Sequence, residues 1–302
     1  MFKRFRNNCI LTAMIGSRPN PLTSMKKHVS LVLTGLLVTT LALGQKSAPV
    51  GIQLYSFRSE FAKDVPGTMA KVKQMGFREA EIAGTYDLSL PDFRKLLDQN
   101  GIKAISTGAS FEDLDSNVPK IVEEAKALGV KYVTCAWIPH PGDAFRIQDA
   151  DQAIDVFNTA GRLLADNGLS LCYHTHGYEF QTYQDGTFFD YMVENFNPKY
   201  VNFEMDVFWV KSPGYDPVAL LQKYPKRFQL MHLKDRKPGT PDSNNGRADV
   251  ESNVTLGQGD IGIAAVMKQA KKSGVKYFFI EDESSRSMEQ VPASVAFLSS
   301  LK

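Results

Sequence analysis

Short apolar or β-branched runs alternate with amphipathic stretches along most of the chain, from Val50 onward. The runs span residues 50–55, 78–83, 102–108, 130–138, 169–176, 200–207, 228–235 and 276–283. Runs of this kind, bounded by turn-forming residues, are typical of strands buried in a parallel sheet. The pattern therefore predicts eight strands.

The segments between these runs carry the spacing of amphipathic helices. The clearest are TMAKVKQMG, LPDFRKLLDQNG, VPKIVEEAKALG and IAAVMKQAKKSG, and each ends in a glycine shortly before the next run. Alternating strands and helices favour a parallel sheet. Such units, repeated over about 250 residues, predict one (β/α)8 TIM barrel over 45–302, with its active site at the carboxyl ends of the strands. A doubly wound sheet is the alternative, but no glycine-rich phosphate fingerprint follows the first run.

The first 44 residues have a different pattern. Lys26 and Lys27 precede an apolar run that ends in Ala42-Leu43-Gly44, a small-x-small cleavage site. These features predict a leader over 1–44 that contains a secretory signal peptide starting at Met25, and hence a periplasmic or secreted protein. An uncleaved anchor is the alternative, but the run is shorter than the ~20 residues that a membrane span needs. We therefore expect no stable membrane insertion after cleavage.

Charge and cysteine content narrow the class of protein further. Removing the leader takes away six basic residues and no acidic one, which moves the formal net charge from +2 to −4. A mildly acidic protein is a poor partner for nucleic acid, whose phosphates need a basic surface. Cys135 and Cys172 remain in strand-like runs, which excludes a disulfide framework. The sequence is compatible with a homo-oligomer but does not specify one.

Polar side chains that suit a barrel core poorly gather at the ends of the last four runs. They are His174, His176, Glu179, Glu204, Asp206, His232, Lys234, Asp235, Glu281, Asp282 and Glu283. Alternation along a strand places His174 and His176 on one side, and likewise His232 and Lys234. Each residue alone is explained by capping or hydrogen bonding. Their recurrence on four successive strands predicts a site for a divalent metal ion such as Mn, Mg, Co or Zn.

Several motifs in this order resemble a known family. They are GIQLYSFR, MGFREAEIAG, YHTHGYEF, FEMDVFWV, LMHLKD, VTLGQGDIG and FFIEDE. Together they are similar to the sugar phosphate isomerase/epimerase group of the xylose isomerase-like TIM barrel superfamily, over nearly the whole chain beyond the leader. The resemblance implies one metal held by Glu179, Asp206, His232 and Glu281. For the ligand from the fifth strand we favour Glu179 over His174, and the reverse assignment stays open.

The resemblance also implies roles in catalysis. Glu179 and Glu281 would form the acid/base pair for moving a proton next to a carbonyl, while the metal stabilises the negative charge. His174 and His176 would polarise or protonate a substrate oxygen. Lys234 would stabilise an oxyanion, or else form a salt bridge to a barrel carboxylate. Glu204 is expected to support the site rather than to bind the metal.

The first, second and fourth runs supply candidate substrate contacts. Gln53, Tyr55, Glu81, Trp137 and His140 offer amide, carboxylate and aromatic groups that suit a carbohydrate, and ordinary packing at strand ends is the alternative.

Two segments rich in turn formers follow the seventh run. The segment RKPGTPDSNNGRADVESN, residues 236–253, would lie over the active-site mouth as a lid or substrate loop, or else be a solvated insertion. In the LGQGD motif, 256–260, the glycines should form a turn and Asp260 should cap the next helix.

We interpret the sequence as an exported, metal-dependent carbohydrate enzyme of the isomerase/epimerase type. A lyase, hydratase or hydrolase of 3-keto-glycosides is the alternative, because that chemistry also begins by removing a proton beside a carbonyl. A sugar-binding barrel without catalysis is a further alternative, against which the intact polar set argues. A DNA-repair endonuclease is disfavoured, because it needs a histidine-rich cluster of several metals and the chain beyond residue 44 has only His140, His174, His176 and His232.

Overall fold

A computed structural model describes residues 50–301, and the predicted leader lies outside them. Eight strands close into a barrel in the order β1-β12-β9-β8-β5-β4-β3-β2. They are β1 (Gly51–Gln53), β2 (Glu79–Ile82), β3 (Lys103–Gly108), β4 (Tyr132–Cys135), β5 (Ser170–His174), β8 (Val201–Asp206), β9 (Phe228–Leu233) and β12 (Tyr277–Ile280). Every neighbouring pair is parallel. The predicted TIM barrel is confirmed, and the doubly wound alternative is wrong.

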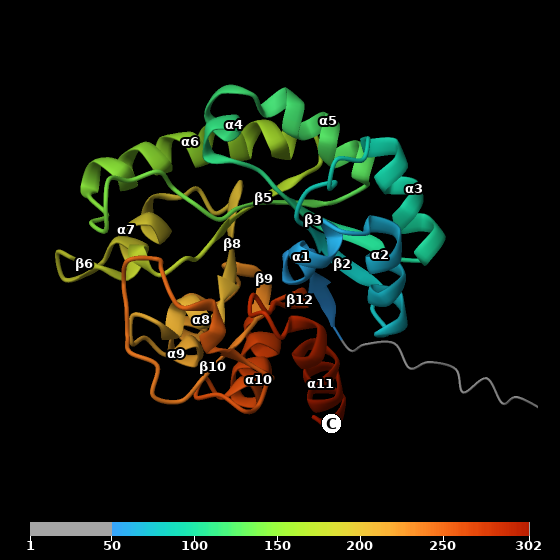
Figure 1. Cartoon of the computed structure of the whole chain (residues 1–302). Coiled ribbons are helices and arrows are strands. Elements are labelled where there is room, and N and C mark those ends of the chain that lie inside the picture. The colour runs from blue at the N-terminus through green and yellow to red at the C-terminus, as the bar shows by residue number, and fades with distance from the viewer. Residues whose placement is uncertain (1–49, 302) are drawn as a thin grey trace, which may run out of the picture. The chain divides into compact units, whose positions relative to one another are not determined.

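Helices surround the ring of strands, as Figure 1 shows for α3, α5 and α6. They are α1 (Arg58–Phe61), α2 (Val65–Gln74), α3 (Leu90–Asn100), α4 (Phe111–Ser116), α5 (Val118–Leu128), α6 (Ile147–Asp166), α7 (Phe188–Asn195), α8 (Val207–Lys211), α9 (Pro217–Lys223), α10 (Ile263–Ser273) and α11 (Ser287–Ser300). Ser89 caps the start of α3, and Gly101, at φ 65°, ends it. In the part of the chain that is described, no helix combines the length and apolar character that crossing a membrane requires.

Single 3-10 turns and two small hairpins complete the fold. The turns are η1 (Leu54–Phe57), η2 (Tyr178–Phe180) and η3 (Val250–Ser252). The hairpins pair β6 (Thr182–Tyr183) with β7 (Gly186–Thr187), and β10 (Asp235–Arg236) with β11 (Asn253–Val254). The sequence pattern predicts neither hairpin, because two-residue strands carry no periodicity.

The barrel interior has an apolar layer beneath a polar one. The apolar layer consists of Ile105, Tyr132, Cys172, Leu230 and Phe279, which come from five strands spread around the ring and so meet at its axis. One step further along the same faces come polar side chains, which lie at the carboxyl ends of the strands. The larger apolar core fills the space between the outer faces of the strands and the helices. The apolar layer therefore forms the floor of the polar end of the barrel.

The long segment after β9 is anchored at both ends. Its base is the β10–β11 pair, in which Arg236 faces Asn253. Asp235, 1% exposed, accepts hydrogen bonds from the backbone N–H groups of Gly257 (2.8 Å), Gly259 (3.0 Å) and Ile261 (3.3 Å). This predicted site residue therefore holds a loop rather than facing the cavity.

The LGQGD motif differs from its predicted role in one respect. Gly262, not Asp260, is the N-cap of α10, and no side chain caps that end. Asp260 instead forms a two-point ion pair with the Arg236 guanidinium, at 3.1 and 2.9 Å. The prediction of a helix cap is wrong, because the guanidinium engages both carboxylate oxygens of Asp260.

The middle of the 236–253 segment packs on the loops that follow β4, β5 and β8. Gln181 Nε2 donates to Asn244 O at 2.9 Å, and Ser243 N donates to Ser212 O at 2.8 Å. A Cβ atom at Gly246 would lie 2.8 Å from the Tyr178 ring, and its φ of 71° also favours glycine. The segment is therefore packed against the mouth of the barrel rather than solvated on all sides.

Gly259→Ala tests the anchoring of this segment. The added methyl group would meet the Asp235 carboxylate and the Arg236 carbonyl oxygen, the latter at 2.6 Å. We expect a loss of about 1–3 kcal/mol in the free energy of unfolding, as for other overpacked sites. Gly108→Ala is the matched control, since a Cβ atom there meets nothing within 4 Å. Equal stability of the two variants in urea unfolding would contradict the close packing described here.

Candidate metal centre

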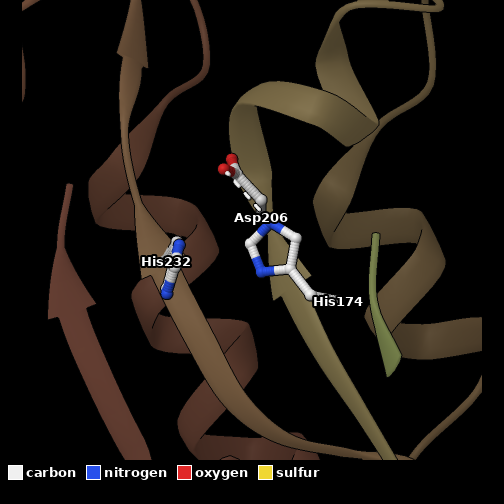
Figure 2. Close-up of side chains that lie close together, drawn as sticks. All are labelled: His174, Asp206 and His232. Carbon is white, nitrogen blue, oxygen red and sulfur yellow. Dashed lines mark ion pairs between the residues drawn. The ribbon is translucent and has the colours of Figure 1, made fainter. Parts of the chain in front are cut away.

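His174, Asp206 and His232 bring three ligand atoms together at the carboxyl end of the barrel. The three residues lie on β5, β8 and β9, are all buried, and offer atoms within 4.8 Å of one another. Register explains the meeting, because His174 lies opposite Glu204 and Asp206 lies opposite His232 on adjacent parallel strands. Figure 2 shows the three side chains converging, with Asp206 paired to His174. An imidazole pair with a carboxylate suits a divalent transition metal such as zinc.

Further carboxylates contact this group from neighbouring strands. His174 Nδ1 lies 2.9 Å from Glu204 Oε2, and His174 Nε2 lies 3.9 Å from Asp206 Oδ2. His232 Nε2 lies 2.9 Å from Glu81 Oε1, and His232 Nδ1 lies 3.2 Å from Glu281 Oε2. Both imidazoles are thus held between two carboxyl groups.

Lys234 supplies the ammonium group of this network. It is 1% exposed, and its Nζ lies 3.0 Å from Glu281 Oε2 and 3.6 Å from Asp206 Oδ2. It also contacts Glu283. Burial disfavours the charged form, but these carboxylates outweigh it and hold the pKa of Lys234 well above 10.5. The salt-bridge interpretation of Lys234 is confirmed, and its ammonium is committed to carboxylates rather than turned to the cavity.

The network carries more buried carboxyl groups than cations. The buried carboxyl groups of Glu81, Glu204, Asp206 and Glu281 lie around Lys234 and the two histidines, and the half-buried Glu283 also contacts Lys234. Burial raises the pKa of Asp206 and raises that of Glu204 well above 4.5. Burial and the nearby His232 lower the pKa of His174 to about 4, so its ring is neutral and can donate a lone pair.

Two oxygens in the network fit a bound cation. Among the described residues, Glu204 Oε1 and Asp206 Oδ2 have no hydrogen-bond partner although both are buried. An unsatisfied buried carboxylate oxygen is costly unless a donor or a metal completes it. The donor set and its excess negative charge therefore fit a divalent ion.

The structure does not bring Glu179 to this group. Glu179 lies on η2 with no exposed surface, and its Oε1 accepts a hydrogen bond from His176 N at 2.8 Å. Burial raises the pKa of Glu179 to about 7, although the Tyr173 hydroxyl and nearby backbone N–H groups partly oppose this. His174, which the sequence interpretation kept as the alternative to Glu179, is the residue from this part of the chain that lies in the group. Glu179 instead fixes the backbone that carries His176.

A cavity of about 470 Å³ opens above the metal group. It is lined by Gln53, Tyr55, Glu81, Ile82, Ala83, Gly108, Ala109, Ser110, Thr134, Ala136, His174, His176, Trp209, His232, Glu281 and Glu283. Three predicted substrate residues therefore face it, namely Gln53, Tyr55 and Glu81. A cavity of this size, with convergent polar groups at its base, is typical of a small-molecule site.

The other two predicted substrate residues lie beside the cavity rather than in its wall. Trp137 stacks on His140 with ring centroids 4.9 Å apart, and both pack against Tyr178. His140 Nδ1 is hydrogen-bonded to Ile138 O at 2.7 Å. Asp282 also turns away from the cavity, since it is buried and accepts hydrogen bonds from Ser284 and Gln290.

Sequence reasoning missed two parts of the cavity wall. One part is aromatic, and the other consists of small residues. Trp209 on α8 stacks on His176 with ring centroids 4.6 Å apart. Gly108, at the end of β3, and Ala109 and Ala136, just after β3 and β4, also line the cavity. The signal for Trp209 was its place three residues after Asp206 at the start of a helix. Small apolar residues past a strand end carry no comparable signal.

The geometry defines a TIM barrel with a candidate metal site, and comparison with known proteins gives its family. The chain belongs to the xylose isomerase-like TIM barrel family, whose model matches residues 69–301. A solved sugar phosphate isomerase/epimerase of Parabacteroides distasonis ATCC 8503 superposes with a TM-score of 0.68 at 26% identity, covering 83% of this chain and 97% of that one. The structure of the IolI protein with a bound zinc atom superposes with a TM-score of 0.65 at 16% identity, covering 83% of this chain and 96% of that one.

The amino-acid sequence is also similar to that of a dehydratase. An inosose dehydratase of Geobacillus kaustophilus (strain HTA426) is 26% identical over 207 residues, which cover 57% of this chain and 65% of the relative. The chain thus spans less than two thirds of the length of that relative.

Glu179→Gln tests the buried carboxyl group behind His176. Between pH 4.5 and about 7 the unfolded chain has released this proton while the native state still holds it, so the wild type loses stability as pH rises. The quantity of interest is the unfolding free energy of the variant minus that of the wild type. We expect this difference to be about 3 kcal/mol more positive at pH 8 than at pH 4. Urea unfolding at both pH values measures the difference, with the exposed substitution Glu123→Gln as control. A difference between wild type and variant that does not change with pH would contradict the raised pKa.

Proposed function

We propose that this protein is a metal-dependent lyase that eliminates water or an alcohol from a polyhydroxylated ketone. The observation that carries the proposal is the buried group His174, Asp206 and His232 at the base of an open, polar cavity. The similarity to an inosose dehydratase supports elimination rather than isomerisation. The reaction class is therefore the one that the sequence interpretation placed second.

The metal would be held by His174, Asp206 and His232, with Glu281 beside them at the cavity edge. A divalent ion there would act as a Lewis acid that polarises a carbonyl oxygen and stabilises its negative charge. Neutral His174 offers a lone pair, and Asp206 offers an oxygen that accepts no hydrogen bond. These are the properties that a ligand set requires.

Glu281 is the residue best placed to remove a proton from the substrate. It lines the cavity, and although burial disfavours its charge, Lys234 and His232 hold its pKa well below 4.5. Glu281 is therefore ionised at neutral pH and able to accept a proton. His176 also lines the cavity, and burial together with His174 lowers the pKa of its ring well below 6.5, so it acts as a neutral hydrogen-bonding partner for a substrate hydroxyl.

An isomerase or epimerase is the second candidate. It would use the same base and the same metal, because both reactions begin with loss of a proton beside a carbonyl. The similarity to the sugar phosphate isomerase/epimerase of Parabacteroides distasonis supports it. Export also belongs to the proposal and rests on the pattern of residues 25–44 alone, so N-terminal sequencing of the mature protein tests it.

A product analysis separates the two reactions. The protein is loaded with Mn²⁺, Co²⁺ or Zn²⁺ and offered cyclic and open-chain keto-polyols and 3-keto-glycosides in deuterated water. A lyase yields a product that has lost water or an alcohol, whereas an isomerase or epimerase yields a product of unchanged composition that carries deuterium. Activity that survives removal of metal by a chelator would overturn both proposals.

Glu281→Gln tests the assignment of the base. The amide keeps the shape of the carboxyl group but cannot accept the proton, so we expect turnover to fall about 100- to 10,000-fold. Steady-state rates on the substrate found above measure the loss. The exposed substitution Glu289→Gln is the control and should leave the rate unchanged. A wild-type rate in the Glu281 variant would remove this residue from the mechanism.

A further inference from the structure

Each histidine of the metal group has one ring nitrogen hydrogen-bonded to a buried carboxyl group that is not itself a member of the group. His174 Nδ1 lies 2.9 Å from Glu204 Oε2, and His232 Nε2 lies 2.9 Å from Glu81 Oε1. The remaining nitrogens, His174 Nε2 and His232 Nδ1, lie toward Asp206 and Glu281. The two imidazoles are thus oriented in the same way, with one nitrogen hydrogen-bonded to Glu204 or Glu81 and the other directed at Asp206 or Glu281.

Glu81 is held by donors from three other strands. Gln53 Nε2 on β1 donates to its Oε1 at 2.5 Å, the Ser106 hydroxyl on β3 donates to its Oε2, and His232 on β9 approaches its Oε1. The side chain is 2% exposed. A carboxylate that is fixed in this way across the barrel keeps little capacity for a ligand. Its contacts do not support the role in substrate binding that the sequence suggested.

Carboxyl groups compete for the N–H groups of His232. Glu281 Oε2 lies 3.2 Å from Nδ1, while Glu81 Oε1 at 2.9 Å and Glu204 Oε1 at 3.4 Å lie near Nε2. Two carboxyl groups on the Nε2 side favour retention of the proton there. A proton retained on Nε2 leaves Nδ1 free to bind a metal, since a metal-bound histidine commonly donates its other N–H to a carboxylate.

We propose that Glu81 is a positioning residue that acts through His232, by accepting the Nε2–H bond and so presenting Nδ1 to the metal ion. Glu204 does the same for His174 through Nδ1. This inference rests on the proposed metal-dependent function, because it assigns the metal to the His174, Asp206 and His232 group. It changes Glu81 from a substrate contact to a determinant of metal affinity.

The test measures the binding of Co²⁺ to the purified protein by calorimetry. Loss of such a supporting carboxylate commonly costs 10- to 100-fold in metal affinity, and we expect about that loss in Glu81→Ala. Glu81→Gln keeps an acceptor oxygen and should recover part of the affinity. Glu204→Gln should weaken binding through the other histidine. The exposed substitution Glu123→Ala is the control and should bind Co²⁺ as the wild type does.

Spectroscopy distinguishes positioning from direct ligation. At saturating Co²⁺, Glu81→Ala should keep the visible absorption spectrum of the wild type, because the ligands are unchanged, whereas Asp206→Ala should alter it. In the Zn²⁺ form, the Nε2 proton of His232 should give a protected low-field NMR signal that Glu81→Ala loses. Should Glu81→Ala fail to fold, Glu81→Gln carries both measurements with a smaller expected loss.

Three results would overturn the inference. Wild-type Co²⁺ affinity in both Glu81 variants, combined with a raised KM, would restore Glu81 to substrate binding. An unchanged His232 proton signal in Glu81→Ala would show that Glu81 does not act through this ring. A wild-type protein that binds no Co²⁺ or Zn²⁺ would overturn the metal-dependent function as well, which separates that failure from the other two.

Discussion

The polar end of this barrel depends on how buried negative charge is compensated. Carboxyl groups from β2, β8 and the segment after β12 converge on an axis where Lys234 and two imidazoles are the neighbouring basic groups. Isolated charges of this kind cannot be removed from water without partners. The arrangement therefore fits a divalent cation, and the same carboxyl groups hold the rings of His174 and His232 through hydrogen bonds.

The apolar floor beneath this set matters as much as the ligands. Cys172 precedes His174 by two residues on β5, and Leu230 precedes His232 by two residues on β9. Each strand thus contributes an apolar side chain to the floor and a polar one to the site. The buried apolar floor lowers the polarity beneath the metal group, which strengthens the electrostatic interactions within it.

Strand periodicity accounts for what the sequence could predict. The eight strands and the convergence of His174, Asp206 and His232 follow from alternation and from the fixed end at which barrel sites lie. Periodicity stops where a strand stops: β5 ends at His174 and the chain turns at Gly177, with φ at 98°. Glu179, which the resemblance offered as the ligand from the fifth strand, therefore lies on η2 and away from the group. Glu81 and His232 are 151 residues apart, and no local pattern could show that they form a pair.

The paired base of the 236–253 segment separates changes within the segment from changes in the barrel that carries it. Pairing of Asp235 and Arg236 with Val254 and Asn253 closes the segment upon itself before it reaches the mouth. Insertions, deletions and substitutions beyond that pair can then accumulate without shifting β9 or α10. The part of the rim near Gly246, beside Trp137 and Tyr178, is accordingly where the shape of the cavity mouth can change without altering the group of His174, Asp206 and His232.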